Sequence, residues 1–259
     1  MTTTINHSKL LLFAAAILGA FLSIPQLALA AAGQQDAGAA VRAKLDKSQF
    51  KDVLTSVDSS GIATLSGTVS LYEYKSDAAK RAFKVKGVTA VRNEIQVAGP
   101  AVSDEQLQKS LAEKLSYDRI GYGNEFDAIS LNVQNGVVTL GGHAHDYPNR
   151  DSALALVATT PGVKDLIDEI EVDPLSTMDW DIRVAVARAV YGYPTLNKYA
   201  VDPAKPIRIS VQNGHVELYG VVDSEADKDT ANIRANGVPG VFSVKNYLEV
   251  AGKPSEKKP

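Results

Sequence analysis

The sequence predicts an α+β protein of three tandem αββαβ modules, each a three-stranded mixed sheet covered on one face by two helices. Two observations predict this class: one glycine-based pattern occurs three times at the same spacings, and each copy shows the same order of apolar periodicities. We expect module 1 over residues 36–99, module 2 over 103–174 and module 3 over 176–250.

The repeated pattern is built from three glycines. The segments SGIATLSG, NGVVTLGG and NGHVELYG each place a second glycine six residues after the first, and a Gly-Val pair begins 20 residues further on. Such regularity indicates structural roles for nine residues, which are Gly61, Gly67, Gly87, Gly136, Gly142, Gly162, Gly214, Gly220 and Gly240.

Each glycine has an expected place in the module. Asn135-Gly136 and Asn213-Gly214 favour two-residue hairpin turns, and Ser60-Gly61 is a weaker form of that signal. The second glycine is expected where another backbone or a helix approaches closely. The third is expected where a helix ends and the chain reverses into the last strand, which can return parallel to a neighbour.

Two helices per module are predicted from N-cap residues and from the spacing of apolar residues. Asp146 and Asp223 are expected N-caps of the helix that precedes the third glycine. A second helix is predicted before each hairpin, because leucines recur every four residues over 107–115 and Ser103 begins a capping box.

The first 30 residues are typical of a secretory signal peptide. Lys9 precedes a long apolar run that ends in Ala28-Leu29-Ala30, and Pro25 favours cleavage after Ala30 over a membrane anchor. The chain contains no cysteine, so we expect neither a lipoprotein nor a thiolate site. The expected product is a soluble periplasmic protein without a transmembrane span, ending in a disordered tail over 251–259.

No motif in the chain nominates an enzyme. Nucleotide-binding loops, nucleophile elbows and zinc-protease helices do not occur. His143 and His145 would place two imidazoles on one strand face, but a zinc site needs further protein ligands. We therefore interpret them as polar residues at a strand end beside a helix cap, and we predict no metal and no cofactor. The net charge of −3 and the expected export disfavour nucleic-acid binding.

The glycine skeleton resembles the BON domain family (bacterial OsmY and nodulation). The matching pattern is G-x-x-x-L-x-G followed by G-V-x-x-V-x-N, and it covers nearly all of the chain after the apolar start in three copies. The resemblance implies the αββαβ fold, a role in maintaining the cell envelope during stress such as osmotic stress, and phospholipid binding as the proposed activity.

Charge distribution favours module 1 as a membrane-binding surface. Module 1 carries ten basic and seven acidic residues, whereas module 2 carries five and thirteen. The second helix of module 1 also contains aromatic residues, including Phe83, and such a helix can lie on anionic lipid. The alternative is a solvated helix face with Phe83 in the core. The candidate lipid-binding residues are Lys75, Lys80, Arg81, Lys84 and Lys86.

Aromatic residues near the first helices of modules 2 and 3 form a second candidate surface. These two modules have about ten extra residues between first helix and first strand, a length that needs a reason. Clustered tyrosines suit protein interfaces, or they cover the small cores. A protein-binding adaptor or chaperone is therefore the alternative to lipid binding. The residues are Tyr117, Tyr122, Phe126, Trp180, Tyr191, Tyr193 and Tyr199.

Overall fold

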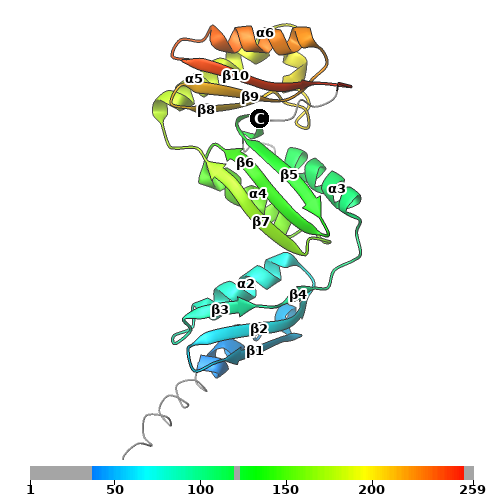
Figure 1. The fold of residues 1–259 in the computed structure, drawn as a ribbon, viewed down its shortest axis with the longest axis vertical. Helices are drawn as coiled ribbons and strands as arrows, with labels where there is room; N and C mark the ends of the chain where they lie inside the picture. The colour runs from blue at the N-terminus through cyan, green and yellow to red at the C-terminus, as the bar shows by residue number, and fades with distance from the viewer. Residues whose placement is uncertain (1–36, 120–122, 254–259) are drawn as a thin grey trace, which may run out of the picture.

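The computed structural model describes residues 37–119 and 123–253. The expected signal peptide, Tyr122 and most of the expected tail lie outside the described residues. Three modules follow one another along the long axis of the molecule (Figure 1).

The three modules have the same order of elements. Module 1 contains helical residues 37–44, η1 (Ser48–Phe50), β1 (Val53–Val57), β2 (Ile62–Val69), α2 (Tyr72–Phe83), β3 (Ala90–Asn93) and β4 (Gln96–Val97). Module 2 contains α3 (Asp104–Tyr117), η2 (Asn124–Phe126), β5 (Ala128–Gln134), β6 (Val137–Ala144), α4 (Tyr147–Ala158) and β7 (Asp165–Val172). Module 3 contains α5 (Thr177–Tyr191), η3 (Asn197–Ala200), β8 (Arg208–Gln212), β9 (His215–Val222), α6 (Glu225–Asn236) and β10 (Ser243–Val250).

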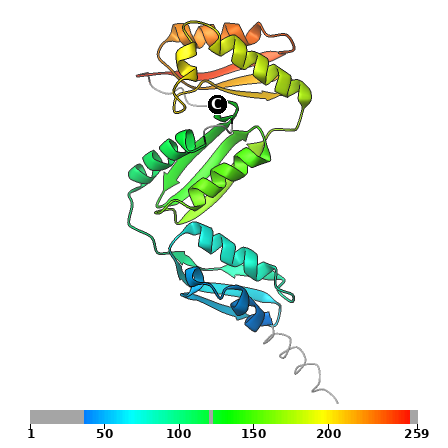
Figure 2. The same ribbon diagram turned by 180° about the vertical axis from the view of Figure 1, so that it is seen from behind.

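Each sheet is mixed, as predicted. The middle strand pairs antiparallel with the first strand, for example Thr55 with Leu65, and parallel with the last, for example Leu140 with Asp168. Seen from both sides, the helices of each module lie together on one face of its sheet (Figure 1, Figure 2). The α+β class and the αββαβ module are therefore confirmed.

Each module encloses its own apolar core. Fully buried side chains include Leu65 and Ile95 in module 1, Leu111 and Leu140 in module 2, and Leu218 in module 3. Burying one such side chain stabilises a fold by about 1.5–3 kcal/mol. Within residues 37–119 and 123–253, no helix combines the length and apolar character needed to cross a bilayer.

The hairpin turns differ between module 1 and the others. Asn135 (φ 55°) and Gly136 (φ 79°) both have positive φ, as a type I′ turn requires, and Asn213 and Gly214 repeat this. In module 1 only Gly61 has positive φ, and Asp58 Oδ1 accepts hydrogen bonds from the backbone N–H groups of Ser60 and Ile62. The weaker Ser-Gly signal thus corresponds to a longer, side-chain-capped turn.

The second glycine of each module lies against the neighbouring strand. A Cβ atom on Gly142 would lie 2.1 Å from the Ala128 carbonyl oxygen, and one on Gly67 would lie 2.0 Å from the Asp52 oxygen. The approaching group is therefore strand backbone rather than a helix. The third glycines, Gly87, Gly162 and Gly240, have φ of 92°, 97° and 90°.

Two of the three helix caps named from the sequence are confirmed, and one is wrong. The Asn149 N–H donates to Asp146 Oδ1 at 2.8 Å, and the Gln106 N–H donates to Ser103 Oγ at 3.2 Å. In module 3 the N-cap is Ser224 rather than Asp223. Asp223 instead pairs with Lys198 at 2.7 Å, because the helix begins one residue later than expected.

Candidate functional site

The basic residues of α2 fall into two groups. Lys75 lies near the start of the helix, where its Nζ is 3.2 Å from Asp165 Oδ2 of module 2. Lys80, Lys84 and Lys86 are exposed at or beyond the end of the helix. Arg81 pairs with Asp77 at 2.7 Å and lies over the Phe50 ring. The five candidate residues therefore do not form one free surface, and the exposed cations gather around the C-terminal end of α2.

Phe83 lies among these exposed cations. Its side chain is 60% exposed, so the alternative that placed it in the core is wrong. Ala78 and Ala82, four positions apart, are the α2 residues buried in the core, and Val85 is buried there beyond the end of the helix. Phe83 follows Ala82 by one residue, which rotates it about 100° away from the core-facing side.

The aromatic candidates of modules 2 and 3 divide between core and surface. Phe126 and Tyr199 are buried in the core of module 3, so Phe126 joins the two modules. Tyr191 packs against this core and donates from its hydroxyl to the Ile207 carbonyl at 2.6 Å. Tyr117, Trp180 and Tyr193 are exposed, although the Tyr117 hydroxyl reaches Asp202 of module 3 at 3.0 Å.

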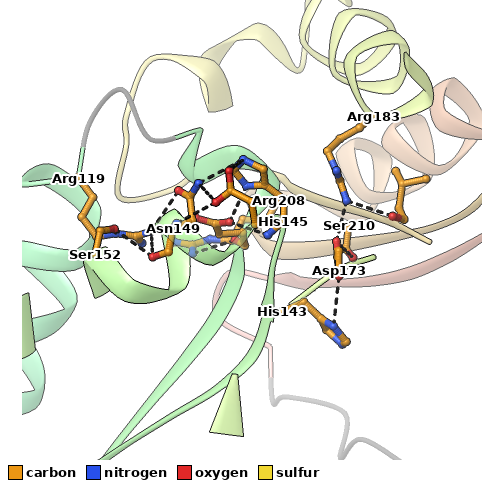
Figure 3. Close-up of polar contacts among 12 residues, drawn as sticks. Arg119, His143, His145, Asn149, Ser152, Asp173, Arg183, Arg208 and Ser210 are labelled. Atoms are coloured by element: carbon orange, nitrogen blue, oxygen red, sulfur yellow. Dashed lines mark hydrogen bonds and ion pairs between the residues drawn. The ribbon is translucent and has the colours of Figure 1, made fainter. Parts of the chain in front are cut away.

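Modules 2 and 3 also meet beside the buried residue Asp127, and Figure 3 shows three of its partners, Arg119, His145 and Arg208. Arg119 Nη2 lies 3.1 Å from Asp127 Oδ2, and His145 Nδ1 lies 2.8 Å from Asp127 Oδ1. Arg208 of module 3 donates to the Asp127 carbonyl oxygen at 3.4 Å. Trp180 lies against the same place, with its ring centroid 5.5 Å from that of Phe126.

A second buried carboxylate, Asp173, lies in the segment that joins modules 2 and 3 (Figure 3). Arg183 Nη2 lies 2.6 Å from Asp173 Oδ2, and Gln212 donates to Asp173 Oδ1 at 2.8 Å. His143 Nδ1 lies 3.6 Å from the same carboxylate, whose hydrogen bond raises the pKa of His143 above its usual value despite the opposing effect of burial. We call the Asp127 and Asp173 clusters together the 2/3 junction.

The 2/3 junction was not predicted from the sequence. Asp127 stands between Phe126 and Ala128, and Asp173 stands between Val172 and Pro174; these neighbours alone do not specify the burial of a carboxylate. The two histidines contact different carboxylates, because β6 ends at Ala144 and His145 lies beyond it. Among the described residues no group of three or more His, Asp or Glu side chains is placed to hold a metal ion. The Asp127 carboxylate accepts from donors of its own module, whereas the Asp173 carboxylate accepts from Arg183 and Gln212 of module 3. The Asp173 cluster is therefore suited to coupling the modules.

Modules 1 and 2 meet differently, along a shallow groove between α2 and α4. The groove has a volume of about 530 Å³, and its lining includes the apolar residues Leu154 and Ala158. Its charged walls include Lys80 from α2 with Asp151 and Asp168 from module 2. We call this groove, with the Lys75–Asp165 contact, the 1/2 junction.

Comparison with known proteins identifies the repeated module. The family model described as "BON domain" matches residues 34–99, 103–174 and 195–252, and the third match begins after α5. Osmotically-inducible protein Y of Escherichia coli (strain K12) is 29% identical over 132 residues, which is 47% of this chain. The aligned part spans 61% of that relative's length.

Solved structures of CdsD, a structural protein of the type III secretion system of Chlamydia trachomatis, align at lower similarity. Two chains are 18% and 17% identical, with TM-scores of 0.23, over 83% and 89% of this chain and 92% and 99% of theirs. At these values the likeness supports no statement about this protein. The three family matches cover most of the residues, and the chain belongs to the BON domain family.

Proposed function

We propose that this protein is a non-enzymatic periplasmic protein that maintains the cell envelope by binding anionic phospholipid surfaces. Membership of the BON domain family and the similarity to an osmotically inducible protein support an envelope role linked to osmotic stress. One observation carries the lipid assignment: Phe83 and the cations Lys80, Lys84 and Lys86 are all exposed within seven consecutive residues at the C-terminal end of α2.

The chemistry of this surface suits a membrane interface. Lysines near anionic headgroups contribute about 1 kcal/mol each, and an aromatic ring can enter the boundary between headgroups and acyl chains. Lys80, Phe83 and Lys84 are separated by three and four positions, so they share one side of α2. Arg81 is left out of the proposed surface because it pairs with Asp77.

Co-sedimentation with vesicles tests this proposal. The wild-type chain should bind vesicles containing anionic lipid, bind neutral vesicles weakly, and lose affinity as salt rises, because salt screens surface charge. The double variant Lys80→Glu, Lys84→Glu should lower the affinity by more than about tenfold. Phe83→Ser should lower it further at high salt, where apolar contact remains.

The matched control is Lys44→Glu, Lys47→Glu, which makes the same charge change at exposed positions of module 1 outside α2. Equal losses in both double variants would mean that only net charge matters. An absence of binding by the wild-type chain would refute the lipid proposal. The adaptor alternative would then take its place, since Leu175, Met178 and Trp180 expose apolar side chains near the 2/3 junction.

A further inference from the structure

One side of α2 is shared between the proposed lipid surface and module 2. Ser76 follows Tyr72 by four residues, and Phe83 follows Ser76 by seven. The three residues therefore lie along the same stripe of the helix. At the C-terminal end of this stripe Phe83 is exposed. At its N-terminal end Tyr72 and Ser76 line the groove against α4. In the view from behind, α2 lies directly against the end of module 2 that carries α4 (Figure 2).

Specific contacts hold the N-terminal end of this stripe to module 2. The Lys75 Nζ lies 3.2 Å from Asp165 Oδ2, with side-chain exposures of 17% and 48%. The Tyr72 hydroxyl donates to the Leu166 carbonyl oxygen at 3.5 Å, and the Tyr72 ring packs against the core of module 2. The Lys75 cation and the Tyr72 ring are therefore unavailable to a membrane that contacts Phe83.

Module 2 resembles an anionic membrane in the charge it presents to α2. Asp151, Asp165 and Asp168 lie on the side of module 2 that borders α2, where Arg150 pairs with Asp151 and Asp168, and Asp165 pairs with Lys75 of α2. They attract the same lysines that would meet anionic headgroups, and they repel the headgroups themselves. A membrane and module 2 thus compete for one helix side.

We infer that module 2 is an intramolecular competitor of the membrane, so the 1/2 junction is an autoinhibitory contact. The inference rests on the proposed lipid-binding function and adds its regulation. Separation of modules 1 and 2 releases Tyr72 and Lys75, which extends the lipid-binding surface from Phe83 along the whole of α2. Binding to an anionic membrane and opening of the 1/2 junction therefore favour each other.

The test compares two variants that each remove one negative charge from module 2. Asp165→Asn breaks the ion pair with Lys75, and the amide oxygen can still accept from the Leu166 N–H. Glu105→Gln changes an exposed residue of α3. Asp165→Asn should tighten binding to vesicles with anionic lipid by about fivefold, the effect of about one additional lysine at the surface, and Glu105→Gln by less than about twofold.

A distance measurement provides a second readout. Because the chain has no cysteine, nitroxide labels can be attached at Lys51→Cys in module 1 and Gln108→Cys in module 2. Anionic vesicles should broaden and lengthen the distance distribution, and Asp165→Asn should do so without lipid. If Asp165→Asn and Glu105→Gln bind vesicles equally well, or if anionic vesicles leave the label-to-label distance unchanged, the inference is wrong but the proposed lipid binding stands. An absence of wild-type binding would overturn the proposed function as well.

Discussion

The two junctions of this molecule are built from similar residue types but differ in burial. At the 2/3 junction Asp127 and Asp173 are buried, and each accepts from an arginine that is also buried. At the 1/2 junction Asp165 is about half exposed and pairs with one lysine. Module 2 is thus fastened to module 3 by a desolvated ion pair between Asp173 and Arg183, and to module 1 by a contact that water reaches.

This difference has an energetic consequence. Exposed ion pairs contribute about 0–1 kcal/mol, and salt weakens them. Removing one partner of a buried pair costs about 3–5 kcal/mol, because the other charge remains desolvated. Modules 2 and 3 are therefore expected to move as one unit, with module 1 attached through a hinge near Gly99 and Pro100.

The largest effect is expected from Asp173→Ala. This change leaves the Arg183 guanidinium buried without its carboxylate, and it should lower the free energy of unfolding at the 2/3 junction by about 3–5 kcal/mol. Trp180, the single tryptophan of the chain, lies at this junction, so urea unfolding followed by its fluorescence measures the change. The control is Asp181→Ala at an exposed position of α5. A loss under 1 kcal/mol, or an equal loss in the control, would remove the contrast between the junctions.

A smaller effect is expected from pH. The hydrogen bond to Asp173 raises the pKa of His143 in the folded state, so the charged imidazole stabilises the 2/3 junction. This contribution is fully present below the unfolded pKa of about 6.5 and is lost as pH rises through the higher folded pKa. Trp180-monitored stability should therefore fall modestly above pH 6.5, and His143→Gln should abolish that dependence. A rise in stability over this interval would contradict the assigned contact.

The fold was predictable from the sequence, because its signals are local. Asn-Gly turns, glycines at fixed spacings and period-two strands depend on a few neighbouring residues, as the positive φ of both Asn135 and Gly136 illustrates. Phe83 was not predictable in this way. The periodicity of α2 left open whether the core would take Phe83, and two small alanines with Val85 fill that space instead.

Sequence patterns could not predict the 2/3 junction, for a different reason. Asp127 and Asp173 are buried among residues distant in the sequence, such as His145 and Gln212, and no local periodicity reports such contacts. The distance in sequence between the first helix and the first strand gave a partial signal. In modules 2 and 3 this connection is longer and contains Phe126 and Tyr199, both of which are buried in the core of module 3. Their aromatic content indicated either a protein interface or core cover, and the structure places Phe126 and Tyr199 in the core.

The most direct test of this account measures both junctions in one experiment without lipid. Nitroxide distances from Lys51→Cys to Gln108→Cys report on the 1/2 junction, and those from Gln108→Cys to Asp229→Cys report on the 2/3 junction; all three positions are exposed. Raising the salt concentration should broaden the first distribution, because it screens the Lys75–Asp165 pair, and should leave the second narrow. Equal broadening at both junctions, or a first distribution that stays as narrow as the second, would contradict the account.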